Sequence, residues 1–229
     1  MEINILHLLE GAKKARGLAV VIDVFRAFSV TCYLIDNGAR EIISVADIDI
    51  AYELKRNHPE YILIGERNEM VPPGFDYGNS PTHLQHIDFT GKTIVHTTSS
   101  GTQGLVNASN ASIRITGSFV NAPAIARYIQ DQKPSQVSLV CMGYAMQHPT
   151  EEDTFCAEYI KATLENKNAD FNQMKEIIRN TSGQRLFKPE NQSFSPAGDF
   201  ELCTQLGKFN FVLKAKETNG LLRLTQIII

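Results

Sequence analysis

Short unbroken apolar runs alternate with amphipathic segments along the first two thirds of the chain. The runs have the length of strands buried on both faces, and the segments between them carry apolar residues at helical spacing. Strands that alternate with helices on short connections form right-handed βαβ units. We therefore predict an α/β fold in which a mainly parallel, mixed sheet is covered by helices on both faces. Strands are expected at residues 18–22, 40–46, 61–65, 92–97, 112–116 and 136–141.

The two ends of the chain give weaker patterns. Residues 3–9 fit either an edge strand or a short helix. No linker or internal repeat is present, so we expect one domain over residues 1–229, with its motifs in 18–160 and a less regular part at 182–229. The later elements are expected as helices at 150–166 and 172–180, followed by strands at 209–213 and 221–229 whose order in the sheet is not readable.

Polar residues gather where the predicted strands end. The carboxyl ends of parallel strands lie along one edge of a sheet, and open α/β proteins bind their ligands there. We therefore expect these loops to converge on one crevice. The groups concerned are Asp23 with Arg26, Glu66 with Arg67, Ser99-Ser100-Gly101, Gly117-Ser118 and Gly143.

Composition narrows the class of protein. The 229 residues are 43% hydrophobic and 21% charged, as in an ordinary globular protein, and the net charge is -3. Scattered basic residues argue against nucleic acid as a partner. No apolar run approaches the roughly 20 residues of a membrane span, and the first residues lack a basic signal-peptide region. We expect a cytoplasmic protein whose four separated cysteines are reduced core thiols.

Familiar nucleotide and hydrolase fingerprints are absent. The chain has no G-x-x-x-x-G-K-[ST], no G-x-G-x-x-G after a strand and no G-x-S-x-G. His83 and His86 have the spacing of paired metal ligands, but no third ligand stands beside them. We interpret this histidine pair as part of a surface helix.

Acidic residues in different loops are the strongest chemical signal. Hard oxygen ligands from separated segments are what Mg²⁺ uses, although a single acid is more often a helix cap or a surface charge. Together with Arg26, Arg67 and a Ser-Ser-Gly-Thr turn that opens a helix, they describe a site for an anion and a metal. The candidate Mg²⁺ ligands are Asp23, Glu66, Asp76, Glu152 and Asp153.

Seven blocks of the sequence together resemble the 2-phosphosulfolactate phosphatase family, in order and in spacing. The resemblance covers residues 18–160 and is weak beyond Ser182. The blocks are V-V-I-D-V-F-R-A at 20–27, N-G-A-R-E-I at 37–42, G-E-R at 65–67, G-F-D-Y-G-N-S-P at 74–81, T-T-S-S-G-T at 97–102, G-S-F-V-N-A at 117–122 and E-D-T-F-C-A at 152–157.

The resemblance implies a three-layer α/β/α fold and Mg²⁺-dependent hydrolysis of 2-phosphosulfolactate to 3-sulfolactate in coenzyme M synthesis. The chain departs from the family pattern at Phe28, at Asn68-Glu69 and at Glu158, which bears on the substrate more than on the fold. The implied site comprises Asp23, Arg26, Glu66, Arg67, Asp76, Asn79, Ser80, Ser100, Gly101, Thr102, Glu152 and Asp153.

Our hypothesis from the sequence is a Mg²⁺-dependent phosphatase for a small phosphorylated acid with a second anionic group, with 2-phosphosulfolactate as the best single substrate. Asp23, Arg26, Glu66 and Arg67 would be catalytic, and Asn79, Ser80, Ser100, Gly101 and Thr102 would bind the substrate. The alternatives are a phosphatase of the same fold for another phosphomonoester and a non-catalytic protein that binds a sulfonate or phosphate metabolite. A homodimer is expected only as the commonest oligomer.

Overall fold

The computed structural model describes all residues from Met1 to Ile229. The strands are β1 Glu2–His7, β2 Leu18–Ile22, β3 Glu41–Ser44, β4 Ile62–Gly65, β5 Thr93–Thr97, β6 Ile113–Gly117, β7 Gln136–Cys141, β8 Phe211–Thr218 and β9 Leu221–Ile228. The α-helices are α1 Leu8–Lys14, α2 Ala27–Asp36, α3 Ile48–Asn57, α4 Pro81–Leu84, α5 Gly101–Asn107, α6 Ala122–Gln132, α7 Glu151–Leu164, α8 Phe171–Asn180 and α9 Gly198–Cys203. Three 3-10 helices are η1 Phe119–Asn121, η2 Ser182–Phe187 and η3 Pro189–Asn191.

All the strands form one sheet in the order β1-β7-β2-β6-β8-β9-β3-β5-β4. Five of the strand pairs are parallel and three are antiparallel, which confirms the predicted mainly parallel, mixed sheet. The undecided segment at the amino end is an edge strand, β1, which pairs with β7. None of the helices has the length and apolar character needed to cross a membrane.

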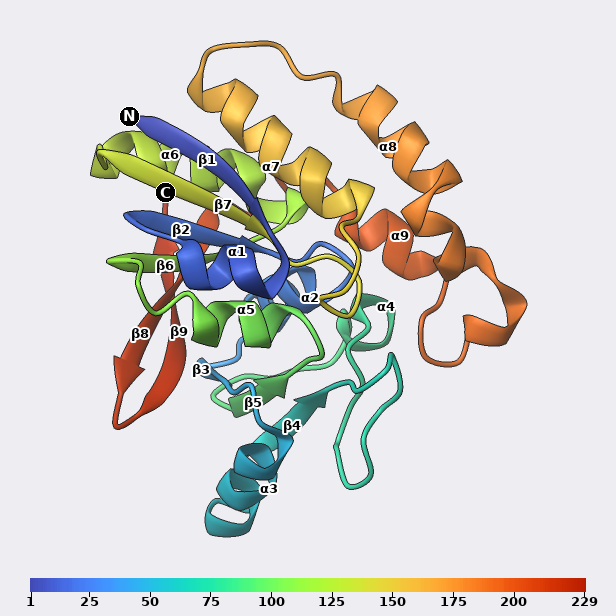
Figure 1. Ribbon diagram of the computed structural model, residues 1–229. Helices are drawn as coiled ribbons and strands as arrows, with labels where there is room; N and C mark the ends of the chain where they lie inside the picture. Colours follow the sequence, from blue (N-terminus) through green and yellow to red (C-terminus); the bar gives the residue numbers. More distant parts are fainter.

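A hairpin from the end of the chain divides the parallel strands into two groups. β8 and β9 pair with each other and lie between β6 and β3, both antiparallel to their neighbours. Adjacent strands rotate by roughly 20–25°, and more in two-stranded ribbons. Three strand-to-strand rotations separate β6 from β3, so one group of parallel strands is turned strongly relative to the other. In Figure 1 both groups consequently run toward the loops at the centre of the molecule.

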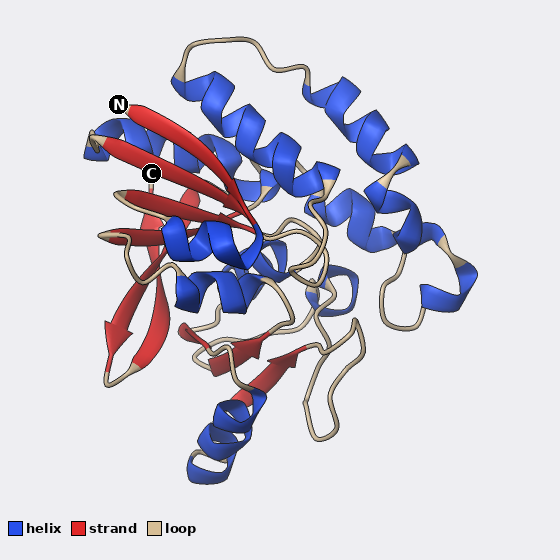
Figure 2. Ribbon diagram, viewed as in Figure 1, coloured by secondary structure: helices blue, strands red, loops and turns tan.

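Helices cover both faces of this sheet, as Figure 2 shows, which confirms the three-layer architecture. Along β2, Ala19 and Val21 pack in one core with residues of α2 and α5. The alternate residues Leu18, Val20 and Ile22 pack in a second core with α6 and α7. This alternation is the period of a strand buried on both sides. It places the carboxyl end of β2 between two helical layers.

Candidate active site

A pocket of 270 Å³ lies between the carboxyl ends of the two groups of parallel strands. Its lining comes from the ends of β2, β4, β5 and β7 and from one segment near the end of the chain, so the predicted convergence of loops is confirmed for four strands. The lining residues are Asp23, Phe25, Arg26, Glu66, Asn68, Glu69, Asn79, Ser99, Ser100, Gly143, Tyr144, Ala145, Gln147 and Arg185.

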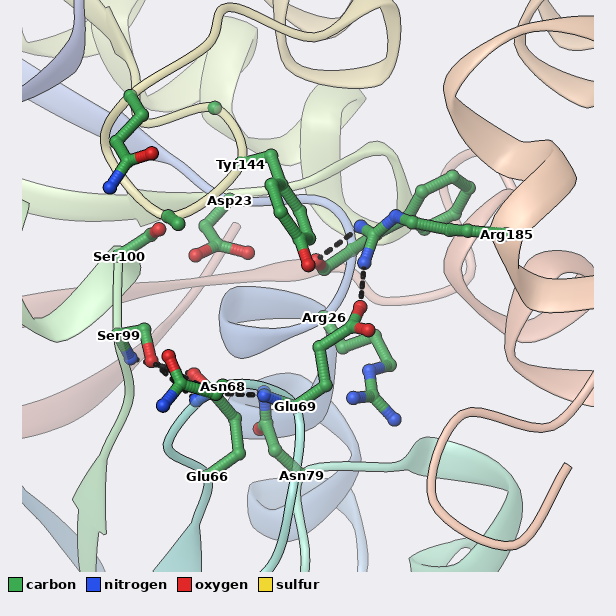
Figure 3. A pocket seen from close by; sticks show the side chains of 14 residues that line it. Asp23, Arg26, Glu66, Asn68, Glu69, Asn79, Ser99, Ser100, Tyr144 and Arg185 are labelled. Carbon is green, nitrogen blue, oxygen red and sulfur yellow. Dashed lines mark hydrogen bonds and ion pairs between the residues drawn. The ribbon is translucent and has the colours of Figure 1, made fainter. Parts of the chain in front are cut away.

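These residues form two regions, shown in Figure 3. We call the first region the floor; it contains the buried residues Asp23, Arg26, Glu66, Asn79 and Ser100. We call the second region the rim; it is more exposed and contains Asn68, Glu69, Tyr144, Ala145, Gln147 and Arg185.

Asp23 lies at the centre of the floor and follows directly after the last residue of β2. Its Oδ1 accepts a hydrogen bond from the backbone N–H of Ala27 at 3.1 Å. Helix α5 lies so close that a Cβ on Gly101 would be 2.8 Å from Oδ2 of Asp23, which explains the glycine at that position. Oδ2 itself accepts no hydrogen bond from the protein, so it remains available to a ligand.

The environment of Asp23 opposes its ionisation. Burial raises the pKa of Asp23 to about 7, the Ala27 N–H opposes this, and the charges of Glu66 and Glu152 raise the pKa further. A carboxylate that is held partly protonated near neutral pH by desolvation and like charge is typical of a functional site. A bound cation would restore its charge.

Glu66 is fixed on the floor by donors from two loops. Its Oε1 accepts from the backbone N–H of Ser99 at 2.6 Å, and its Oε2 accepts from the Ser99 hydroxyl at 3.0 Å. The backbone N–H of Glu69 donates to Oε2 as well, at 2.9 Å. Glu66 therefore ties the end of β4 to the end of β5.

Two further predicted acids lie behind the floor, at the start of α7. Asp153 accepts from the backbone N–H groups of Val24 and Gly143, each at 2.8 Å. Burial, with the charge of Asp23, raises the pKa of Asp153 well above its usual value. Glu152 has one oxygen 3.7 Å from Arg185, whereas its Oε2 is buried without any hydrogen-bond partner.

Arg26 enters the floor from the residue before α2, and its guanidinium is held by Asp199 at 3.1 Å. The same carboxylate accepts from the Ser80 hydroxyl at 2.7 Å and from the backbone N–H of Thr82 at 3.0 Å. Both members of the ion pair are fully buried. Ser80 therefore supports Arg26 through Asp199 and does not itself line the pocket as a substrate ligand.

Arg67 lies outside the pocket, contrary to its predicted role beside the phosphate. Its guanidinium donates to the carbonyls of Glu66 and Ala46 and to the hydroxyl of Thr97, at 2.7–3.0 Å. These acceptors lie beside it in the strand-end loops and turn the side chain away from Asp23. Arg67 therefore does not line the pocket, and its role as a phosphate clamp stays a prediction.

Asp76 also lies outside the pocket that Asp23 and Glu66 line. It accepts from the backbone N–H of Leu63 at 2.8 Å and from the Lys55 ammonium at 3.1 Å, and its side chain is 37% exposed. Asp76 does not line the pocket. Its placement fits a structural role at β4 and contradicts the prediction of a metal ligand.

The turn before α5 contributes only part of what was predicted. Ser100 lines the pocket, but Gly101 and Thr102 do not. The Thr102 hydroxyl donates to the carbonyl of Thr98 at 3.0 Å and accepts from its backbone N–H at 2.9 Å. Thr102 therefore stabilises the turn, and Gly101 permits the close approach to Asp23.

Asn79 reaches the floor as predicted and is oriented by a buried histidine. Its Oδ1 lies 3.1 Å from Nε2 of His96. Burial, with the charge of Arg67, lowers the pKa of His96 to about 3, so its imidazole is neutral at ordinary pH. A neutral ring that donates from Nε2 fixes the Asn79 oxygen and leaves the Asn79 amide N–H groups for an anion in the pocket.

The basic residue of the rim, Arg185, was not among the residues predicted from the sequence. It comes from η2, in the part of the chain where the pattern was least regular. Arg185 forms an ion pair with Glu69 and donates to the carbonyl of Phe25 at 3.2 Å. Its guanidinium lies 5.0 Å from the centre of the Tyr144 ring. In Figure 3 Glu69 and Arg185 meet on the side of the pocket opposite the serines.

The donor set suits a metal of the Mg²⁺ kind. The chain has no preassembled group of three His, Cys, Asp or Glu ligands. Mg²⁺ does not require one, since it is commonly bound by one or two carboxylates with water and substrate oxygens. Asp23 and Glu152 each keep one oxygen free of hydrogen bonds, whereas Glu66 and Asp153 use both oxygens as acceptors. Asp23 and Glu152 are therefore the residues that fit this ion best.

An α/β sheet with an acidic floor, two guanidinium groups and amide donors at its strand ends defines an enzyme of small anionic substrates. The model of the 2-phosphosulpholactate phosphatase family matches residues 4–218, and the chain belongs to that family. The expected enzyme class, a phosphoric monoester hydrolase, is confirmed at the level of the family.

Several relatives are similar over most of their length, and each is named probable 2-phosphosulfolactate phosphatase. The protein of Bacillus subtilis is 31% identical over 212 residues, 92% of each chain. That of Carboxydothermus hydrogenoformans is 34% identical over 93% of this chain and 92% of its own. That of Thermotoga maritima is 37% identical over 85% of this chain and 87% of its own.

Proposed function

We propose that this chain is a Mg²⁺-dependent phosphatase that hydrolyses 2-phosphosulfolactate to 3-sulfolactate and phosphate. The observation that carries the proposal is Asp23, a buried carboxylate with one free oxygen at the centre of the pocket. Family membership and the names of the relatives supply the substrate.

The charge balance of the pocket supports a requirement for a cation. The carboxylates of Asp23, Glu66, Glu152 and Asp153 lie at or behind the floor, whereas Arg26 is already paired with Asp199. A phosphorylated acid would bring further negative charge into this buried space. Binding such a substrate would be strongly unfavourable without additional positive charge.

In this proposal the carboxylates of Asp23 and Glu152 would hold Mg²⁺. When bound, the ion would stabilise negative charge on the phosphoryl oxygens. Arg26 and the Asn79 amide N–H groups would donate to the phosphoryl oxygens from the floor. Asp199 keeps the Arg26 guanidinium in position, since the pair is buried and has additional donors from the α4 region.

Asp23 has two routes to the reaction. In the first, one carboxylate oxygen of Asp23 attacks phosphorus while the P–O bond to 3-sulfolactate breaks, and water then hydrolyses the phospho-aspartate. In the second, Asp23 accepts the proton of an attacking water. A phosphoryl group trapped on residue 23 would establish the first route. Labelled oxygen that passes from water directly into phosphate in a single turnover, without a covalent species, would establish the second.

The testing experiment measures phosphate release from 2-phosphosulfolactate and a panel of small phosphorylated acids. Release is expected with Mg²⁺ and not with EDTA, and Mg²⁺ added back should restore it. Full activity in EDTA would contradict the metal dependence. Faster turnover of another panel member would assign a different phosphomonoester, and ligand-induced stabilisation without turnover of any member would indicate a binding protein.

A further inference from the structure

The two guanidinium groups of the pocket differ in how accessible they are to a ligand. Arg26 is fully buried and is bound to a carboxylate that has no exposed surface. Arg185 lies at the rim with 18% of its side chain exposed, and its partner Glu69 is 19% exposed. An incoming anion can therefore reach Arg185, whereas the Asp199 side of Arg26 is closed.

Glu69 is placed against Arg185 by an unusual backbone. Residues Asn68 and Glu69 have φ of 53° and 67°, in the left-handed region that favours glycine. The turn is closed by hydrogen bonds between Arg67 and Met70. This backbone region is strained for residues other than glycine. The turn maintains that conformation while its Glu69 carboxylate faces a residue 116 positions further along the chain.

The surroundings of Arg185 are those of an anion subsite. Tyr144 lies 5.0 Å from the guanidinium, and Gln147 of the same loop also lines the pocket. The hydrogen bond to the carbonyl of Phe25 fixes one edge of the guanidinium. The guanidinium also faces two carboxylates, Glu69 in an ion pair and Glu152 at 3.7 Å. The Glu69 carboxylate occupies the position that a carboxylate or sulfonate of a ligand would take.

We propose that Arg185 binds the second anionic group of the substrate, and that this group replaces the Glu69 carboxylate on the guanidinium. This inference rests on the proposed function and extends it to the choice of substrate. Arg185 is then the residue that selects phosphomonoesters with an additional sulfonate or carboxylate. Glu69 is the competing anion that a phosphomonoester without such a group cannot displace.

The test compares 2-phosphosulfolactate with isopropyl phosphate, which carries phosphate alone. Arg185→Gln is expected to raise KM for 2-phosphosulfolactate about 10- to 100-fold, the value of one charge-assisted contact. Any effect through Glu152 bears on both substrates alike, so the ratio of kcat/KM for 2-phosphosulfolactate to that for isopropyl phosphate should fall at least tenfold. Arg185→Lys should recover part of the loss, because it keeps the charge but not the bidentate geometry.

Glu69→Gln provides an independent variant with the opposite expected effect. It removes the competing charge, so KM for 2-phosphosulfolactate should fall several-fold while isopropyl phosphate is little affected. Arg179→Gln is the matched control, since Arg179 is 51% exposed on α8 and pairs with Glu201 away from the pocket. An equal loss with both substrates in Arg185→Gln, or an unchanged KM in both pocket variants, would overturn the subsite.

Calorimetric titration separates this inference from the proposed function. If no substrate is hydrolysed, yet 2-phosphosulfolactate binds wild type at least tenfold more tightly than Arg185→Gln and isopropyl phosphate binds both alike, the subsite stands and the phosphatase proposal falls. If neither binding nor turnover depends on Arg185, the subsite falls whatever the reaction.

Discussion

The floor and the rim of the pocket are built in different ways. The floor residues Asp23 and Glu66 follow directly from buried strands and are fixed by backbone donors, and Ser100 lies in the short turn between β5 and α5. The rim is made of loops with left-handed residues, including Ala145 and Met146, and of a segment that arrives from near the end of the chain. In the proposed function the floor supplies the reaction, and the rim, made of loops, chooses the substrate.

The largest expected effect concerns the floor. Asp23→Asn should lower kcat by about 10²- to 10⁴-fold, the contribution of a positioned acid–base or nucleophilic carboxylate. The same change should stabilise the protein. Folding raises the pKa of Asp23 from 3.8 to about 7, so above pH 7 the native state contains a buried charge that the unfolded chain tolerates better.

Stability is measured by urea unfolding at pH 8 in EDTA. The free energy of unfolding of Asp23→Asn should be roughly 1–3 kcal/mol larger than that of wild type. Loss of stability together with loss of activity would show that Asp23 is a structural residue. Unchanged activity of Asp23→Asn would show that Asp23 does not take part in the reaction.

The second effect concerns the histidine beneath Asn79. His96 has a folded pKa of about 3 against 6.5 in the unfolded chain, so its contribution is fully present above pH 6.5 and is lost as the pH falls toward 3. His96→Gln retains a donor to Asn79 but cannot titrate. Between pH 7 and pH 4 the unfolding free energy of wild type should fall by about 3 kcal/mol more than that of the variant.

Exposed His86 provides the control for this measurement, since His86→Gln should leave the pH dependence close to that of wild type. Parallel curves for wild type and His96→Gln would mean that His96 is charged in the folded protein. The Asn79 amide would then be oriented by something other than a neutral ring.

The third effect tests the contact between α5 and the floor. In Gly101→Ala the new methyl would lie 2.8 Å from Oδ2 of Asp23, and a displaced carboxylate should lower kcat by about 10- to 100-fold. Gly104→Ala, one turn along the same helix, would place its methyl within clashing distance of Sδ of buried Met142 and away from Asp23, so it shows what a core clash alone does, and kcat of the folded variant should stay near wild type. Equal activities in the two variants would show that the position of Asp23 is not critical.

The contrast also explains what the sequence could predict. Buried apolar runs of strand length end just before Asp23, before Glu66 and before the turn that holds Ser100. Local sequence patterns therefore predicted the sheet, the layers and much of the floor. Arg185 was not, because its position depends on the packing of η2 against residues more than a hundred positions away. The place of the β8–β9 hairpin inside the sheet depends on long-range pairing of the same kind.

The errors within the predicted set have a local cause. Arg67 and Ser80 lie next to pocket residues in sequence, but their side chains find acceptors in neighbouring loops. Spacing along the chain shows which loop a residue occupies. It does not show which way the side chain turns, since that depends on unpaired backbone and carboxylate groups that only the fold brings near.

The smallest expected effect concerns Asp76, an acid that lies in neither the floor nor the rim. Asp76→Asn makes the same chemical change as Asp23→Asn, but Asp76 bonds only to Leu63 and Lys55 near the surface. We expect unchanged kcat and an unchanged Mg²⁺ requirement, with stability reduced by less than about 1 kcal/mol for the loss of an exposed ion pair. Mg²⁺ titration of activity in both variants is the measurement. If Asp76→Asn raised the Mg²⁺ concentration needed for half-maximal activity while its fold stayed intact, Asp76 would return to the ligand set, and the floor would have to rearrange when the metal binds.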